Sequence, residues 1–118
     1  MNKLRFSIIY AVIRPEISER LSVGIIIVDG DKVDVRYSRQ KLNALQALFP
    51  EKEYRSVARV VTSMRQHQTV NTPEDINYLT RYSNNLVTVS PLQSIDIEPT
   101  IRNKEKLYRN YVYDRMAS

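Results

Sequence analysis

Alternating apolar residues open the chain and predict three consecutive strands. Residues 4–13 place apolar side chains on both faces of an extended backbone, which is typical of a central strand covered on two sides. Residues 22–28 form a second, β-branched run, and residues 33–37 alternate between apolar and charged positions. Asp29-Gly30 separates the last two runs and favours a tight hairpin turn, because glycine accepts the positive φ that such turns require. The pattern therefore predicts an antiparallel sheet with short connections.

A proline and a glycine mark two further features of these strands. Pro15 ends the first strand, because proline cannot donate to the ladder, and a charged loop over residues 15–21 follows. Gly24 lies inside the second strand, where glycine is costly and usually marks a bulge or the close approach of another backbone. With Arg14 and Glu19 just before it in the chain, Gly24 is a candidate for contact with a partner.

The apolar positions change to a helical spacing after Ser38. Leucines and a phenylalanine at positions 42–49 recur every three or four residues, and Ser38 is suitably placed as an N-cap. A second amphipathic helix is predicted from Glu51 to about Gln66. Thr72-Pro73 is typical of a third helix start, with a threonine cap and proline at the first helical position.

The last third of the chain predicts a return to the sheet and then a helix. Residues 86–89 form a short β-branched run, and Ile95 and Ile97 alternate with polar neighbours. From Arg102 onward the apolar spacing is helical. The whole pattern predicts one α+β domain over residues 1–118. It is a small, mainly antiparallel sheet of three to five strands with helices packed on one face and a C-terminal helix.

Composition narrows the class of protein without identifying it. A chain of 118 residues with 42% hydrophobic and 26% charged residues fits one ordinary globular domain. Cysteine is absent, which excludes disulfides, thiolate nucleophiles and cysteine metal sites and suits a reducing compartment. No apolar stretch approaches the ~20 residues of a membrane span, and the first residues do not resemble a signal peptide. We therefore expect a cytoplasmic protein with no membrane contact.

The positive charge is concentrated in one part of the chain. The net charge is +5, and the segment from position 32 to position 65 holds eight basic and three acidic residues. Such a segment favours acidic partners such as nucleic acid, although a solvated helix face has the same composition. The basic face of the second helix lacks interleaved aromatic residues, which many nucleic-acid-binding surfaces have. The candidate nucleic-acid contacts are Arg36, Arg39, Lys41, Lys52, Arg55 and Arg59.

The sequence gives little indication of catalytic chemistry. His67 is the only histidine, and two glycines cannot build a glycine-rich phosphate loop. Three aspartates gather near the predicted hairpin turn, where they favour turn chemistry over a cation site. The sequence therefore predicts no catalytic residue, no metal and no cofactor. The least favoured alternative is an enzyme that would use Arg14, Glu19 and His67.

Tyrosines crowd the predicted C-terminal helix. Tyr108, Tyr111 and Tyr113 cannot all face one core. An exposed group of this kind is typical of a protein interface, so these three are interaction candidates. Amphipathic packing with the hydroxyl groups at the rim is the alternative.

Several segments together resemble a known bacterial family, called domain of unknown function 3037. The strand Tyr10-Ala11-Val12-Ile13-Arg14 is followed by Glu19 and then by Val23-Gly24-Ile25-Ile26, as in that family. Further similar segments are Arg36-Tyr37, Lys41-Leu42, Ala44-Leu45, Asn85-Leu86-Val87, Pro91 and Leu107-Tyr108. Ser22 stands where the family prefers asparagine. The family has no established activity, and its genes often lie beside a HipA-like kinase, so the resemblance implies a protein partner in a toxin–antitoxin or regulatory pair.

The sequence thus favours a non-catalytic interaction domain that serves as an accessory to a partner kinase. The alternative is a nucleic-acid-binding domain that uses the basic helix face. A homodimer is compatible with both hypotheses, because a small sheet leaves a strand edge that can pair across a two-fold axis.

Overall fold

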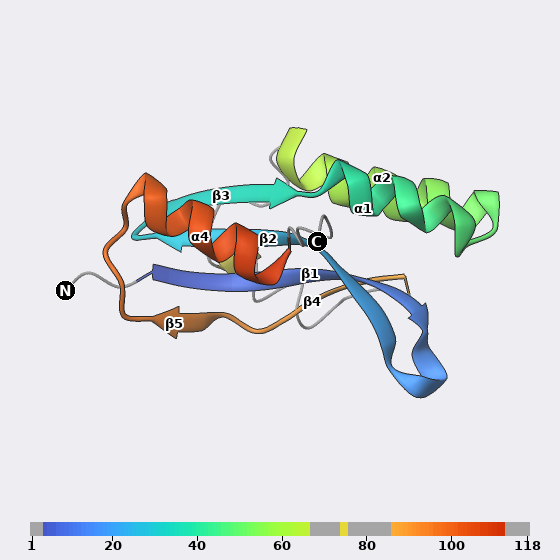
Figure 1. Cartoon of the computed structure of the whole chain (residues 1–118), viewed down its shortest axis with the longest axis horizontal. Helices are drawn as coiled ribbons and strands as arrows, with labels where there is room; N and C mark the ends of the chain where they lie inside the picture. The colour runs from blue at the N-terminus through green and yellow to red at the C-terminus, as the bar shows by residue number, and fades with distance from the viewer. Residues whose placement is uncertain (1–3, 67–73, 76–85, 113–118) are drawn as a thin grey trace.

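Five antiparallel strands form the sheet in the computed structural model, which describes residues 4–66, 74–75 and 86–112 (Figure 1). The strand order is β3-β2-β1-β4, and β5 pairs with the same edge of β1 as β4 does. β1 is therefore central and contacts three other strands. The bounds are β1 Leu4–Arg14, β2 Glu19–Asp29, β3 Lys32–Tyr37, β4 Val87–Val89 and β5 Gln93–Ile95.

The helices begin where polar side chains cap them. The Ser38 hydroxyl accepts a hydrogen bond from the Lys41 amide at 3.1 Å, as the sequence predicted, and the Thr100 hydroxyl accepts one from the Asn103 amide. The second predicted helix is confirmed, whereas the helix start predicted at residues 72–73 lies outside the described residues. The bounds are η1 Pro15–Ile17, α1 Arg39–Ala44, η2 Leu45–Ala47, α2 Glu51–Gln66 and α4 Ile101–Tyr111.

Helices cover both faces of the sheet (Figure 1). On one face, α1, η2 and α2 bury a core that includes Leu42, Leu45 and Val57 against the odd-numbered side of β1. On the other face, Leu107 and Val112 of the α4 segment pack against the even-numbered side of β1. The predicted α+β fold with a C-terminal helix is confirmed, and β1 is the two-sided strand that its apolar pattern indicated.

The β1–β2 hairpin is longer than the sequence predicted. The expected charged loop over residues 15–21 is wrong: β1 continues to Arg14 and β2 starts at Glu19, so the connection is only a short turn. Ser18 closes that turn with a φ of 57°. The end of this hairpin projects away from the rest of the sheet (Figure 1), and solvent on both sides of it accommodates charged residues within regular strands.

A β-bulge at Gly24 is one of two irregularities in the pairing of β1 with β2. Ile9 is opposite Gly24 but Tyr10 is opposite Ser22, which leaves Val23 as the extra residue in β2. A Cβ atom on Gly24 would lie 2.8 Å from the Arg36 carbonyl oxygen. Gly24 therefore marks both a bulge and a close backbone approach, the two features that a glycine inside a strand predicts.

Candidate nucleic-acid interface

The exposed side of α2 carries the candidate site. Lys52, Arg55, Ser56 and Arg59 follow the spacing that places side chains on one helix face. We call these four residues the α2 basic face. It is turned away from the sheet, because the opposite side of α2 buries Val57 and other apolar residues in the core.

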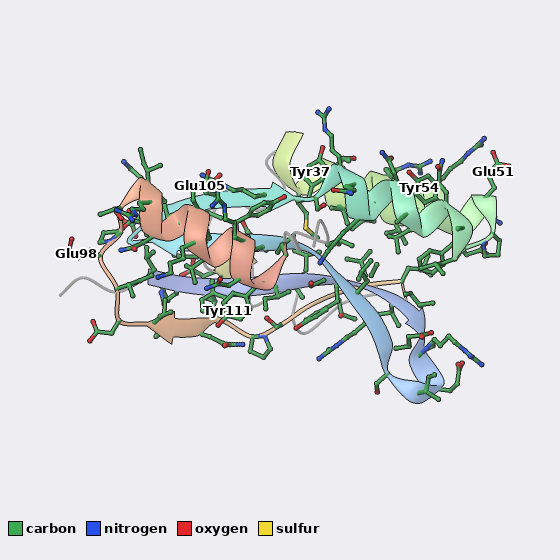
Figure 2. The ribbon with its side chains drawn as sticks, viewed as in Figure 1. Tyr37, Glu51, Tyr54, Glu98, Glu105 and Tyr111 are labelled. Atoms are coloured by element: carbon green, nitrogen blue, oxygen red, sulfur yellow. The ribbon has the colours of Figure 1, made fainter. Side chains whose placement is uncertain are left out.

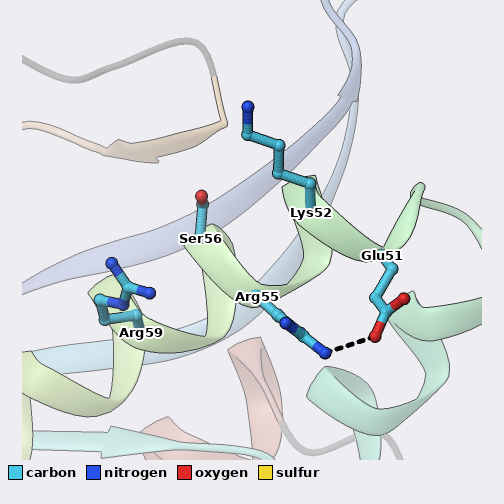
Figure 3. Close-up of a pocket in the computed structure, with 5 residues that line it drawn as sticks. All are labelled: Glu51, Lys52, Arg55, Ser56 and Arg59. Atoms are coloured by element: carbon cyan, nitrogen blue, oxygen red, sulfur yellow. Dashed lines mark hydrogen bonds and ion pairs between the residues drawn. The ribbon is translucent and has the colours of Figure 1, made fainter.

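Two of the three charged side chains on the α2 basic face form no ion pair within the described residues. The guanidinium of Arg55 pairs with the Glu51 carboxylate one turn earlier, at 2.5 Å, and both side chains are exposed. Within the described part of the chain, Lys52 and Arg59 form no ion pair. In Figure 3, Lys52 and Ser56 project on the same side of α2, whereas Arg55 turns toward Glu51. Two free cations and a hydroxyl group are therefore available to an anion.

A shallow hollow of about 370 Å³ lies over this face. The described residues that line it are Glu51 and the four members of the α2 basic face, all from one helix (Figure 3). A surface formed along a single helix suits an extended anion better than a small molecule, which usually needs walls from several elements.

Arg36 does not belong to this surface. Val35 faces the α2 side of the sheet, so Arg36, the next residue in β3, faces the α4 side. There its guanidinium contacts Asp34 at 3.2 Å and, at 2.8 Å, Glu105 of α4, which is labelled in Figure 2. Partial burial acts to lower the pKa of Arg36, but the hydrogen bonds and charges of Glu105 and Asp34 outweigh it and raise the pKa above the ordinary arginine value. Arg36 helps hold α4 on the sheet.

Lys41 and Arg39 lie on α1 in different environments. The Lys41 ammonium donates to the carbonyl oxygen of Ser22 at 2.9 Å and to its hydroxyl at 3.2 Å, which ties α1 to β2. Arg39 is exposed at the first position of α1. Of the six basic candidates from the sequence, the structure thus gathers three on one helix face and engages Arg36 and Lys41 in contacts within the fold.

The candidates Arg14, Glu19 and Gly24 do not form one site. Arg14 and Glu19 are opposite each other at the end of the hairpin, where Arg14 also pairs with Glu16 at 3.5 Å. Gly24 lies five residues further along β2, roughly 16 Å away at the rise of an extended strand. Its lack of a side chain is explained by the β2–β3 approach, so no ligand is needed to account for it.

The tyrosines of α4 pack on the sheet. The Tyr108 hydroxyl donates to the Tyr37 carbonyl oxygen at 3.3 Å, and the Tyr111 ring lies 5.0 Å from the Phe6 ring, centroid to centroid. Tyr111 remains 40% exposed, so its rim faces solvent. For these two residues the arrangement matches amphipathic packing rather than an exposed group. Tyr113 lies outside the described residues.

Sequence reasoning missed three features of possible binding surfaces. Ser56 belongs to the α2 basic face, and its position four residues after Lys52 could have revealed it. Ile17 at the hairpin turn is 60% exposed. The Arg20 guanidinium lies over the Tyr10 ring, 4.0 Å from its centroid, a cross-strand contact that no local pattern signals.

The described segments hold neither a metal-binding cluster nor a membrane-spanning helix. Among residues 4–66, 74–75 and 86–112, no group of three histidine, cysteine or acidic side chains is close enough to hold a metal ion. None of the helices in those segments has the length and hydropathy to cross a membrane. His67 of the least favoured enzyme hypothesis lies outside the described residues.

No protein-family model, curated protein or solved structure matches this chain.

Proposed function

We propose that this domain binds the phosphate backbone of a nucleic acid along the α2 basic face. The observation that carries the proposal is the gathering of Lys52, Arg55, Ser56 and Arg59 on one exposed helix face over a shallow hollow. Lysine, arginine and serine are common contacts to phosphate oxygens in protein–nucleic acid complexes.

The length of the face sets how many phosphates it can hold. Lys52 and Arg59 are seven residues apart, or about 10.5 Å along the helix axis. Successive phosphates of one duplex strand advance about 3.4 Å along the axis, so the face spans roughly three of them. Contacts of this kind neutralise charge without reading bases, and we therefore expect weak binding with little sequence preference.

Fluorescence anisotropy on labelled duplexes at increasing salt concentration tests this proposal. For about three phosphate contacts, the logarithm of the association constant should fall against the logarithm of salt concentration with a slope of about −2.7. The double variant Lys52→Ala with Arg59→Ala removes two contacts, so its slope should be about −0.9. Absence of binding at about 50 mM salt would refute the proposal.

A second double variant provides a matched control. Lys106 and Arg109 are exposed on α4, on the other side of the sheet, and their replacement by alanine removes the same two charges from a helix. Under the proposal this variant keeps the wild-type slope. Equal losses in both double variants would show that only the net charge matters and that α2 is not the site.

A protein partner is the second candidate function, and the projecting β1–β2 hairpin favours it. Ile17 is exposed at its turn, and charged residues near it are exposed as well. The apolar side chain of Ile17 is therefore suited to anchor an interface. The partner implied by the resemblance is a HipA-like kinase, which would be met in the cytoplasm. In titration calorimetry against such a kinase, Ile17→Lys should weaken binding, whereas Leu48→Lys, at an exposed leucine in the turn before α2, should not. Equal effects would reject the hairpin as the contact.

A further inference from the structure

The outer edge of β3 is an unpaired edge of the sheet. β3 ends the strand order, and in the described segments no strand pairs with the side of β3 that faces away from β2. The Ser38 amide donates to the Val23 carbonyl of β2 at 2.8 Å, so backbone groups at even-numbered positions of β3 point toward β2. Those of Val33, Val35 and Tyr37 therefore point outward. The Tyr37 carbonyl oxygen already accepts a hydrogen bond from the Tyr108 hydroxyl at 3.3 Å, and its second lone pair is the one left for another strand. A row of outward N–H and C=O groups is a template for another strand.

The side chains of β3 follow a pattern that is complementary to itself. Lys32, Asp34 and Arg36 share the α4 side of the strand, and Val33 and Val35 share the α2 side. When two such strands pair antiparallel with Val35 on a two-fold axis, each Asp34 lies opposite the second copy's Arg36. Apolar positions then meet apolar positions on the other face.

We propose that β3 pairs with β3 of a second copy of this chain in that register. The outward-pointing residues would form the hydrogen-bonded pairs, with Val35 opposite Val35 and Val33 opposite Tyr37. The Arg36 guanidinium has five N–H donors, and its contacts with Glu105 and Asp34 leave some for a second carboxylate. Oppositely charged cross-strand pairs stabilise a sheet, so two such pairs favour this arrangement.

The same charges disfavour most other registers. An axis on Asp34 places the two Asp34 carboxylates opposite each other, and an axis on Arg36 does the same with two guanidinium groups. A slip by an odd number of positions brings the charged side of one strand against the apolar side of the other. Charged residues on an edge strand commonly prevent pairing. Here their alternation selects a register instead. An axis on Val33 also has no like pairs, and an axis on Tyr37 has none but pairs no residue of β3 except Tyr37 with its own copy.

Symmetry places the two copies so that their helices fall on matching sides. A two-fold axis that continues an antiparallel sheet is perpendicular to it, so both α2 helices lie on one side and both α4 helices on the other. The dimer thus presents two α2 basic faces in the same direction. The inference itself does not depend on nucleic-acid binding. A contact of one six-residue strand is small, so we expect a reversible, concentration-dependent dimer.

Sedimentation velocity of the full chain from about 1 µM to about 1 mM tests the proposal, because weak dimers dissociate within this range. The wild type should shift from monomer to dimer. Asp34→Lys and Arg36→Glu each replace two attractive pairs by two repulsive ones and should weaken dimerisation about 10-fold or more. Far-UV circular dichroism and urea unfolding confirm that both variants are folded. Asp34→Lys also keeps the contact between Arg36 and Glu105.

Mixing the two variants gives the decisive result. In an equimolar mixture, the lysine introduced at position 34 of one chain faces the glutamate introduced at position 36 of the other, and the unchanged Arg36 faces the unchanged Asp34. The mixture should therefore recover the dimer that neither variant forms alone. A wild type that stays monomeric at the highest concentration overturns the proposal, as does a mixture that remains monomeric. Dimerisation of Arg36→Glu at the wild-type level would show the register with Val33 on the axis and overturn the one proposed.

Discussion

Replacement of Gly24 by alanine should destabilise the domain, although the same change stabilises many proteins. The new Cβ atom would lie 2.8 Å from the Arg36 carbonyl oxygen, 3.0 Å from Ile9 Cδ1 and 3.3 Å from Tyr37 Cβ. The nearest of these atoms belongs to the backbone of β3, which is held in the ladder with β2. The clash can therefore be relieved only by moving two paired strands apart.

The magnitude follows from two opposing terms. Forcing an extra carbon into a packed site costs about 1–3 kcal/mol. Gly24 lacks the positive φ that Gly30 has, so alanine also removes freedom from the unfolded chain and returns about 0.4–1 kcal/mol. The steric term is larger because the closest contact is with backbone. We expect a net loss of about 1–2 kcal/mol and a fall in Tm of roughly 4–8 °C for a domain of this size.

Urea unfolding monitored by circular dichroism measures this loss. Gly30→Asn is the control: Gly30 has a φ of 62° and no atom within 4 Å of an added Cβ, and asparagine tolerates that conformation. Its free energy of unfolding should stay within about 0.5 kcal/mol of the wild type. Ile9→Val removes the Cδ1 atom that the new methyl group meets, so Gly24→Ala should cost about 0.5 kcal/mol less in that background. A Gly24→Ala variant as stable as the wild type would refute the close approach.

Three further predictions concern the contacts that join the helices to the sheet. Ser38→Ala removes the acceptor of the Lys41 amide and should lower the free energy of urea unfolding by about 1 kcal/mol; an unchanged midpoint would show that the cap contributes nothing. Leu107→Ala empties a buried position under α4 and should cost about 2–5 kcal/mol in the same assay, whereas a cost well below 1 kcal/mol would mean that α4 is not part of the cooperative core. Arg36→Ala should cost about 0.5–1 kcal/mol, because its partners are half exposed. The pKa of Arg36 is raised, so its stabilising contribution is present below the ordinary arginine pKa and is lost only as the pH rises through the raised value. The cost of Arg36→Ala should therefore be equal at about pH 7 and about pH 10, and a clear decrease over that interval would contradict the assignment.

Local signals in the sequence were sufficient for most of the secondary structure. The cap at Ser38 and the helix Glu51–Gln66 are encoded within a few residues of their own positions, and both are confirmed. The sequence pattern is misleading at the β1–β2 hairpin, because the charged residues beside Pro15 are typical of a loop. A strand that projects into solvent has no buried face to enforce an apolar alternation, so its sequence resembles a loop.

The pattern of apolar and charged positions in the sequence does not reveal long-range contacts. The amphipathic spacing of α4 shows which of its sides is buried, but not which face of the sheet it covers. The charge run likewise identified the cations of α2, which share one helix. It could not show that Arg36 meets Glu105, 69 residues away, or that Lys41 meets Ser22, 19 residues away. These distant partners decide which cations remain free to bind an anion.

The position of β1 between early and late segments has a consequence for how the chain folds. β2 and β3 follow β1 directly and can pair through local turns. β4 and β5, in contrast, come from residues 87–95 and pair with β1 across a long stretch of sequence. The hydrogen bond from the Ser7 hydroxyl to the Ser90 carbonyl, 83 residues apart, adds to this contact. Contacts so distant in sequence form slowly. During synthesis this edge of β1 stays unpaired until residues 87–95 have left the ribosome. We therefore expect the first three strands to assemble early and the nascent chain to be most prone to aggregation until the last third of the sequence closes that edge.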